Sequence, residues 1–314
     1  LRALLENYKG KIQVVGINDL GSIEANAHLI KFDSTHGTLS HDVKTTKEGF
    51  EIGDQKIKVF AERDPAKLPW GIIGADVVLE CTGFFLDKAS AGKHLEAGAK
   101  KVIISAPAKG DIQTIVLGVN DDKIDPSIEI YSNASCTTNC LAPMAKVIDD
   151  NFGLVKGFMT TIHAYTGDQR ILDAPHKDMR RARAAAINIV PTSTGAAKAV
   201  GLVLPHLNGK LDGGAVRVPT PTGSLTDLVC EVSKDTTAEE VNAAFKAASE
   251  SSLSGILEYS TEPLVSTDIV GNPHSNIFDS DLTKADGKLV KVIGWYDNEA
   301  GYSMRTADLI TRIM

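Results

Sequence analysis

The segment Ile12–Asp19, IQVVGIND, is a nearly continuous apolar run that ends on two polar residues. Such a run predicts a buried strand. The preceding segment, Leu1–Gly10, carries its apolar side chains on one helical face and stops at a glycine, which predicts a helix. A helix that leads into a buried strand is the later part of a β-α-β unit. We therefore expect a first strand and its turn ahead of Leu1.

Strand and helix patterns alternate through the rest of the first half. A hairpin is predicted over 50–60, turning at Gly53-Asp54. Further strands are predicted at 75–80, 102–105, 114–119 and 129–132, and helices at 22–32, 87–97 and 136–149. This order predicts an α/β fold with a doubly wound, mostly parallel sheet.

The pattern changes from residue 155 onward. Strands are predicted at 155–165, 214–219, 225–232, 264–269, 275–279 and 289–296, and helices at 193–204 and 238–250. We expect a second, α+β domain with a mostly antiparallel sheet. The segment 166–187 has little apolar periodicity, and an irregular stretch of that length in a compact domain favours a functional role.

Composition excludes several classes of protein. The 314 residues carry 33 Lys+Arg against 40 Asp+Glu, a net charge of −7, which argues against a general nucleic-acid binder. No apolar run reaches the ~18 residues of a membrane helix, and no signal peptide precedes the chain. Four scattered cysteines do not make a disulfide scaffold: Cys81, Cys136, Cys140 and Cys230. We expect a cytoplasmic protein with reduced thiols and no membrane partner.

The strongest local signal is Ser132–Cys140, SNASCTTNC, in which a strand ends and a helix is predicted to begin at Cys136. The N-terminus of a helix favours a thiolate and can bind an anion. From spacing alone, a packed structural cysteine is an equal alternative. A nucleophilic thiol needs a base, and His163 in TTIHAYT lies near the end of the next predicted strand. On its own His163 also fits a hydrogen-bonded structural histidine.

Three further features suit phosphate. The basic cluster 177–183 suits a phosphorylated small molecule, a subunit contact or a solvated face, but it lacks the aromatic residues typical of single-stranded nucleic-acid sites. Ser193–Lys198, STGAAK, is a small-residue helix start, and Arg217 interrupts an apolar strand. A helix cap and an ion pair are the structural alternatives.

Asp19 directly follows the strand that opens the chain, where a dinucleotide-binding fold places a carboxylate on the adenosine ribose. No GxGxxG precedes it, so a turn residue is the alternative.

Five motifs in order resemble the phosphorylating glyceraldehyde-3-phosphate dehydrogenases, and the likeness covers essentially the whole chain. They are SNASCTTN (132–139), TTIHAYT (160–166), PTSTGAAK (191–198), RVPTP (217–221) and WYDNEAGY (295–302). The resemblance implies a Rossmann NAD-binding domain of residues 1–135, completed by a C-terminal helix over 300–314. It also implies a catalytic domain of residues 136–299 and a homotetramer. Relatives carry NGFGRIGR just before the segment similar to Leu1–Gly10, so the first strand and phosphate loop are expected there.

The resemblance also implies roles in the site. Cys136 would be the nucleophile that forms a hemithioacetal and then a thioester, and His163 would raise its thiolate fraction and act as general base. Thr166, Arg181 and Arg217 would hold the phosphate group of glyceraldehyde 3-phosphate. Inorganic phosphate would be bound by Ser135, Thr137, Thr194 and Gly195. No metal is implied.

Four positions match cofactor-binding residues of the family: Asp19, Arg63, Ser105 and Asn298. Asp19 favours NAD, because a carboxylate repels a 2′-phosphate. Ala174 stands where many NAD-using relatives carry a bulkier Leu, which leaves some NADP use open. The resemblance thus predicts an NAD-dependent enzyme of glycolysis and gluconeogenesis that makes 1,3-bisphosphoglycerate.

Two alternatives belong to other classes. An erythrose-4-phosphate dehydrogenase shares SNASCTTN, but its second anion site departs from the STGAAK found here. A non-catalytic binding or scaffold protein on the same fold is the other, and the full set from Cys136 to Arg217 argues against it.

Overall fold

The computed structural model describes residues 1–314, which form two compact units. The first unit comprises residues 1–114, 125–133 and 306–314, and the second comprises residues 115–124 and 134–305. None of the helices has both the length and the apolar character needed to cross a bilayer.

The first unit alternates short strands and helices, as the sequence predicts. Its elements are α1 (Arg2–Asn7), β1 (Gly16–Asn18), α2 (Ile23–Lys31), β2 (Phe32–Asp33), β3 (Gly37–Thr38), β4 (Val43–Thr45), β5 (Gly49–Ile52), β6 (Gln55–Phe60), β7 (Val77–Glu80), α3 (Lys88–Ala91), α4 (Lys93–Glu96), β8 (Lys101–Ile104), β9 (Gln113–Thr114) and β10 (Ile130–Ser132). A 3₁₀ turn at Pro65–Lys67 precedes β7. The predicted hairpin of β5 and β6 is confirmed.

The strands of this unit form two separate four-stranded sheets, where the sequence predicts one. One has the order β1-β6-β5-β4, with only β1 and β6 parallel. The other has the order β7-β8-β10-β9 and is parallel throughout, so the carboxyl ends of its strands share one edge. Buried Val102, Ile103 and Ile104 place β8 within the apolar interior.

The second unit is built on one eight-stranded sheet. Its strands are β11 (Leu154–Ala164), β12 (Val190–Ser193), β13 (Leu211–Val218), β14 (Ser224–Val232), β15 (Leu257–Ser260), β16 (Asn276–Asp279), β17 (Lys284–Asp286) and β18 (Leu289–Tyr296). Its helices are α5 (Cys136–Phe152), α6 (Ala196–Val203) and α7 (Ala238–Ser249), with 3₁₀ turns at Asp121–Lys123, Pro205–Leu207 and Ser280–Leu282. Helix α8 (Ala300–Ile313) begins in this unit and ends in the first.

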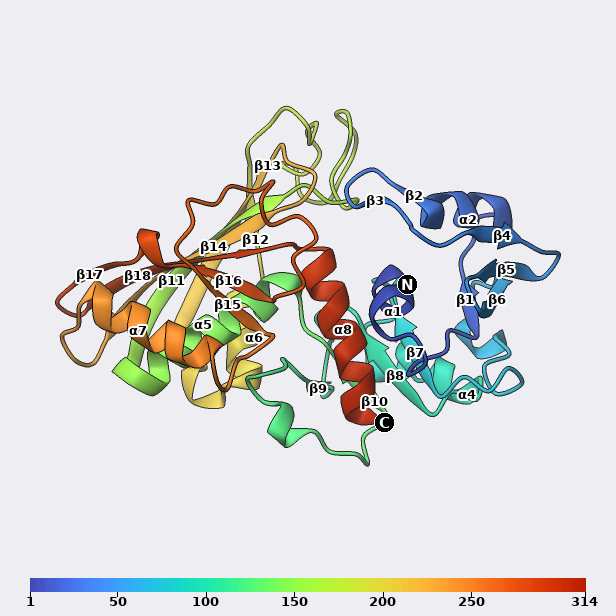
Figure 1. Ribbon diagram of the computed structural model, residues 1–314, viewed down its shortest axis with the longest axis horizontal. Coiled ribbons are helices and arrows are strands. Elements are labelled where there is room, and N and C mark those ends of the chain that lie inside the picture. Colours follow the sequence, from blue (N-terminus) through green and yellow to red (C-terminus); the bar gives the residue numbers. More distant parts are fainter. The chain divides into compact units, whose positions relative to one another are not determined.

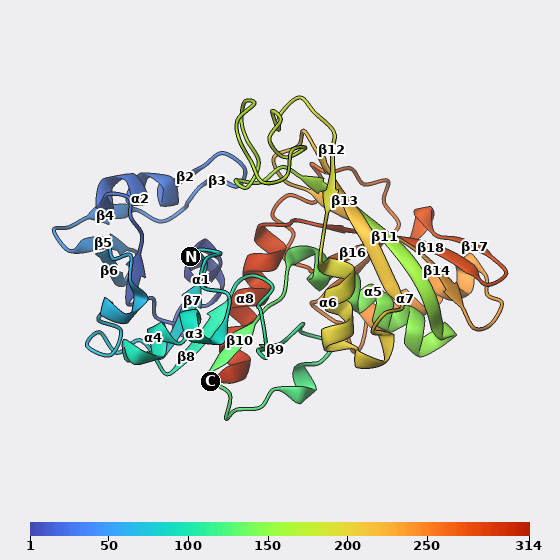
Figure 2. The same cartoon turned by 180° about the vertical axis from the view of Figure 1, so that it is seen from behind.

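Helices α5, α6 and α7 cover one face of this sheet (Figure 1). Burial follows the alternation of β14, whose Thr226, Leu228 and Cys230 are buried against those helices. The sheet is mostly antiparallel, as predicted, but β11 and β13 are parallel over Gly157–Ala164. The segment 166–189 extends away from the sheet as an irregular loop (Figure 2).

Three predicted elements are wrong in part. The strand expected over 114–119 ends at Thr114, because Asn120 Oδ1 accepts the Val116 N–H at 2.8 Å and closes a turn. The strand expected over 264–269 is a run of turns, because Asp268 Oδ2 accepts the Val265 N–H at 2.7 Å. The helix expected over 87–97 divides at Gly92 into α3 and α4.

Candidate active site

Helix α5 begins at Cys136 behind a strained turn. Ala134 is fully buried and has φ +54°, a conformation that costs energy in a residue with a Cβ. Its carbonyl accepts a hydrogen bond from Tyr302 Oη at 2.9 Å, which holds the turn. Ser135 caps the helix by accepting the Thr138 N–H at 3.0 Å. The turn therefore fixes Cys136 at the first helical position, where the helix dipole favours a thiolate.

The second predicted catalytic residue lies against this thiol. His163 Nε2 is 3.5 Å from Cys136 Sγ, and the imidazole is buried near the end of β11. The two side chains meet although 27 residues separate them. The pair can exchange a proton directly, as nucleophilic catalysis by a cysteine requires.

Arg217 contacts the opposite side of the imidazole. In the parallel register of β11 and β13, His163 and Arg217 are direct partners. Arg217 Nη1 lies 2.6 Å from His163 Nδ1 and donates to the Ala164 carbonyl at 2.9 Å. The same carbonyl lies 2.7 Å from Nδ1. Nδ1 thus faces both a donor, Arg217, and an acceptor, Ala164, so either tautomer of the neutral ring has a partner.

Burial and charge set the protonation of this site in the absence of bound anions. Burial lowers the pKa of His163 to about 3, and the charges of Arg217 and Arg181 act in the same direction. Burial raises the pKa of Cys136, although a hydrogen bond from Thr137 and the charge of Arg217 oppose it. The anion-free site therefore favours a thiol beside a neutral imidazole, and the expected rise in thiolate fraction does not follow from His163 alone.

Tyr296 completes the wall behind the thiol and the imidazole. Its ring packs edge-to-face on His163 with centroids 5.9 Å apart. Its hydroxyl is 2.8 Å from both Thr137 Oγ1 and Thr161 Oγ1. Burial raises the pKa of Tyr296 well above its ordinary value, so the phenol stays protonated. Thr137 is therefore already engaged by Tyr296, which leaves its backbone N–H, at the start of α5, as the group that can meet an anion.

Arg181 is held in place by acidic side chains of the loop 166–189. Its guanidinium is bound by Asp168 and donates to Thr192 Oγ1 at 2.9 Å and to the Ser193 carbonyl at 3.1 Å. Thr192 in turn donates to Asp178 at 2.6 Å. The contact with Ser193 places Arg181 beside Thr194 and Gly195, whereas Arg217 lies beside His163.

Helix α6 begins at an open N-terminus. Gly195 occupies the cap position and supplies no side-chain acceptor, and a Cβ added there would meet no atom within 4 Å. Thr194 Oγ1 accepts only the Ala196 N–H, at 3.2 Å. The other N–H groups of the first turn have no acceptor from a cap, which suits an anion.

Thr166 and Asn298 retain unused polar atoms. The Thr166 hydroxyl makes no hydrogen bond, and the residue is half-buried just beyond β11. Asn298 is buried, and its Oδ1 accepts from Ser224 Oγ at 2.8 Å. Ser224 Oγ also accepts the Ala164 N–H at 3.1 Å. These bonds fix the Asn298 carboxamide and leave its Nδ2 donor for a ligand.

The other predicted cofactor residues belong to the first unit. Asp19 follows β1, and its Oδ1 accepts the Gly21 N–H at 2.7 Å while Oδ2 stays free. Arg63 is exposed and makes no ion pair. Ser105 follows β8 and donates its N–H to the Glu80 carbonyl at 2.9 Å. All three lie just after a strand, where ligands bind to α/β sheets.

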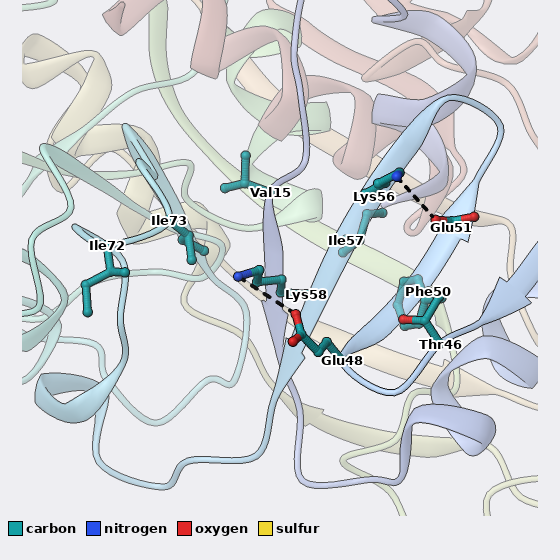
Figure 3. A pocket seen from close by; sticks show the side chains of 10 residues that line it. All are labelled: Val15, Thr46, Glu48, Phe50, Glu51, Lys56, Ile57, Lys58, Ile72 and Ile73. Carbon is teal, nitrogen blue, oxygen red and sulfur yellow. Dashed lines mark ion pairs between the residues drawn. The ribbon is translucent and has the colours of Figure 1, made fainter.

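A hollow on the first unit lies away from these residues. It has a volume of about 400 Å³ and opens over β5 and β6, with Val15, Ile57 and Ile73 on its walls (Figure 3). Two ion pairs cross its rim, Lys56–Glu51 at 3.7 Å and Lys58–Glu48 at 4.0 Å. It holds no nucleophile and none of the predicted site residues, so we do not assign the chemistry to it.

Sequence reasoning missed four residues of the site: Asp168, Asp178, Thr192 and Tyr296. Tyr296 stands inside the motif WYDNEAGY, so its place could have been inferred from its neighbour Asn298. The two aspartates give no local signal, because their role depends on how an irregular loop folds back on itself.

Two family models match the chain. The glyceraldehyde 3-phosphate dehydrogenase NAD binding domain matches residues 1–88, and the C-terminal domain of the same family matches residues 135–298. Together they cover the first sheet of the first unit and almost all of the catalytic candidates.

Curated relatives are similar over nearly the full length. The chain is 60% identical to glyceraldehyde-3-phosphate dehydrogenase 2 of Streptomyces avermitilis over 98% of the chain and 92% of that protein. It is also 60% identical to the glyceraldehyde-3-phosphate dehydrogenase of Streptomyces coelicolor, with the same coverage. The Mycobacterium avium enzyme of that name is 60% identical over 99% of the chain and 94% of its own length.

Proposed function

The chain belongs to the glyceraldehyde 3-phosphate dehydrogenase family, and on that premise we propose that it oxidises glyceraldehyde 3-phosphate to 1,3-bisphosphoglycerate with NAD and inorganic phosphate. The reaction serves glycolysis and, in reverse, gluconeogenesis. The observation that carries the proposal is the 3.5 Å contact of Cys136 Sγ with His163 Nε2 at the start of α5, with Arg217 on the other side of the ring.

Cys136 begins the reaction by adding to the aldehyde carbon. Its sulfur forms the new C–S bond, and the carbonyl oxygen takes up a proton to give a hemithioacetal. Nucleophilic addition needs the thiolate, and the anion-free site disfavours it. An anion on Arg217 and Arg181 offsets the positive charge that lowers the pKa of His163. Binding of the substrate phosphate thus promotes proton transfer from Cys136 to His163.

His163 next acts as the base that oxidation requires. When the Arg217 donors turn to a phosphate, the ring proton rests on Nδ1 and is accepted by the Ala164 carbonyl at 2.7 Å. Nε2 is then free to take the hydroxyl proton of the hemithioacetal. Bound NAD supplies the acceptor for the hydride that leaves the same carbon. The products on the protein are a thioester of Cys136 and a protonated His163.

Inorganic phosphate then attacks the thioester carbon, and the sulfur leaves as a thiolate. We assign this second anion to the open start of α6 at Thr194 and Gly195, together with Ser135, Thr137 and Arg181. Arg181 was expected to bind the substrate phosphate, and its hydrogen bond to the Ser193 carbonyl favours the second site instead. Thr166 and Arg217 remain our candidates for the substrate phosphate.

The residues available for NAD fit that cofactor. Asn298 offers an unused amide donor, which suits the nicotinamide carboxamide. Asp19 has a free carboxylate oxygen, which suits a ribose hydroxyl and repels a 2′-phosphate. Arg63 and Ser105 are our further candidates. We expect NAD to be preferred, with the small Ala174 leaving room for some use of NADP.

We assign cofactor binding to residues 1–135 with 300–314, and catalysis to residues 136–299. The family models on residues 1–88 and 135–298 support that division.

We infer a homotetramer from two apolar surfaces of the second unit. The loop 166–189 exposes Ile171, Met179 and Ile187, each at least 79% accessible. The uncovered face of the sheet exposes Phe158 at 73%. Large exposed apolar surfaces favour association. Two distinct self-complementary surfaces generate a tetramer with three twofold axes, and light scattering of Phe158→Glu should then report dimers.

All four cysteines are free, and the proposed chemistry requires a reduced Cys136. We therefore propose a reducing compartment, the cytoplasm, as its location.

The test is NADH formation from glyceraldehyde 3-phosphate and NAD, followed by absorbance with and without inorganic phosphate. We expect sustained turnover only with phosphate. Erythrose 4-phosphate is the control substrate, and preference for it would move the assignment to the sister enzyme. Absence of turnover with either aldehyde would contradict the proposed function.

A further inference from the structure

A chain of hydrogen bonds runs through the interior of the first unit to its exposed edge. Trp70 Nε1 donates to His94 Nδ1 at 3.0 Å, and His94 Nε2 lies 2.8 Å from Glu80 Oε2. The other carboxylate oxygen of Glu80 accepts the Thr82 N–H at 2.7 Å and the Thr82 hydroxyl. Thr82 Oγ1 in turn accepts the Phe84 N–H at 3.2 Å.

The direction of each bond in this chain is fixed. An indole N–H can only donate, so His94 Nδ1 must accept and the proton of the neutral ring lies on Nε2, facing Glu80. Glu80 therefore receives three donors: the His94 ring, the Thr82 N–H and the Thr82 hydroxyl. Burial alone would raise the pKa of Glu80, but the bonds from His94 and Thr82 lower it below its usual value, so the carboxylate is ionised at neutral pH.

This arrangement is costly for a merely structural contact. Glu80 is 3% exposed, His94 4% and Trp70 5%. An ionised carboxylate in such surroundings is disfavoured unless all its hydrogen bonds are made, and well-packed apolar side chains would stabilise the interior as well or better. The segment that Glu80 holds by its Thr82 bonds gives a reason for keeping the charge.

That segment lies at the carboxyl edge of the parallel sheet. Glu80 is the last residue of β7, and Thr82–Phe84 form the turn that follows, with Gly83 at φ +73°. The Glu80 carbonyl accepts the N–H of Ser105, one of our candidates for cofactor binding. Phe84 is 84% exposed, so its backbone is held by Thr82 while its ring is free to meet a ligand. Ligands of parallel α/β sheets bind outside this edge.

We propose that Glu80, braced by His94 and Trp70, is a positioning residue for the dinucleotide. It holds the turn 81–84 in the shape that the cofactor meets, so that this turn need not be ordered on binding. The inference deepens the proposed function and rests on it, because the ligand at this edge is taken to be NAD.

The test is calorimetric titration of the full chain with NAD, combined with steady-state kinetics. Glu80→Gln keeps the shape but gives His94 Nε2–H an amide N–H₂ in place of one acceptor, and it removes the charge that holds Thr82. We expect the Kd for NAD to rise about tenfold. We expect kcat at saturating NAD, and KM for glyceraldehyde 3-phosphate, to stay within about twofold, because the relay touches no reacting atom.

The double variant Glu80→Gln/Trp70→Phe tests the relay itself. Without the indole donor, His94 is free to carry its proton on Nδ1 and accept from the new amide at Nε2, so NAD binding should be tighter than in Glu80→Gln alone. Trp70→Phe by itself keeps Glu80 charged and should raise the Kd by about threefold or less.

Asp87→Ala is the matched control. Asp87 caps α3 in the same unit by accepting the Ser90 N–H at 2.8 Å, so its loss destabilises the fold without touching the relay. Its Kd for NAD should match that of the unaltered chain although thermal unfolding occurs earlier.

Two results would overturn the positioning role: a Kd for Glu80→Gln within twofold of the unaltered chain, or an equal rise in Asp87→Ala. If Glu80→Gln does not fold, Trp70→Phe still decides through its Kd relative to Asp87→Ala. Failure of the unaltered chain to bind NAD would instead reject the proposed function.

Discussion

Helices α5 and α6 both begin at the active site, but their first turns differ. The start of α5 is closed by Ser135, whose hydroxyl accepts the Thr138 N–H at 3.0 Å. The start of α6 is open, because Gly195 has no side chain with which to accept. A closed start holds one side chain, Cys136, in a fixed place, whereas an open start keeps backbone N–H groups for a ligand that comes and goes.

The contrast separates two tasks that share one kind of structure. The dipole at α5 acts on a covalently attached sulfur, and the dipole at α6 can act on a free anion. The two arginines follow the same division, since Arg217 contacts His163 beside the thiol and Arg181 contacts Ser193 beside α6. Each helix start can be altered separately.

The largest effect is expected from the side chain that α5 presents. Cys136→Ser should reduce turnover by about 10⁴-fold or more, because an alcohol at this site is a far weaker nucleophile than a thiolate. Calorimetry should find NAD binding retained. Turnover near that of the unaltered enzyme would remove the nucleophile from α5 and the comparison with it.

His163→Asn should lower kcat by roughly 10²–10⁴, since the base 3.5 Å from the sulfur is lost. The rate of Cys136 alkylation by iodoacetamide at neutral pH, measured in parallel, should fall as well. If kcat changed less than about threefold, His163 would be a structural residue.

At the other helix, Gly195→Asp gives α6 the cap that it lacks. The carboxylate should satisfy the open N–H groups and repel phosphate, so KM for inorganic phosphate should rise about tenfold or more. KM for glyceraldehyde 3-phosphate serves as the internal control and should change little. Equal changes in both constants would show that α6 does not serve one anion in particular.

The charge beside the thiol gives a prediction about pH. Arg217 lowers the pKa of Cys136, which burial raises, so Arg217→Gln removes the lowering effect. The pH at which Cys136 alkylation reaches half its maximal rate should therefore move upward. Arg183→Gln is a suitable control, because Arg183 is exposed and pairs with Asp173 at 2.7 Å. A shift to lower pH in Arg217→Gln would reverse our account of its charge.

The smallest effect concerns the closed start of α5. Ser135→Ala removes the cap and should lower the free energy of unfolding by about 1 kcal/mol. Thermal and urea unfolding measure this change. A stability equal to that of the unaltered chain would mean that the closed start contributes nothing to fixing Cys136.

Much of this contrast could be predicted from the sequence because caps are local. SNASC marks the start of α5, and STGAAK marks a helix start without a good cap. Asp87 and Thr237 likewise sit at helix starts as N-caps. Local signals failed where a side chain closed a turn, as Asn120 does near 114–119 and Asp268 does near 264–269.

The electrostatics of the site could not be predicted, because they depend on strand register. The sequence favours an antiparallel catalytic sheet, yet β11 and β13 are parallel, and only that pairing sets Arg217 opposite His163. Likewise, the buried relay of Trp70, His94 and Glu80 joins residues from three separate segments. No spacing in the sequence reports these contacts.

The central claim is that Cys136 forms a thioester that inorganic phosphate discharges. Mass spectrometry of the intact protein, quenched within one turnover after mixing with glyceraldehyde 3-phosphate and NAD in phosphate-free buffer, tests it most directly. We predict a single acyl adduct, located on Cys136 by peptide mapping, that disappears when phosphate is added before the quench. An adduct on another cysteine, or NADH formation with no adduct at all, would contradict the account.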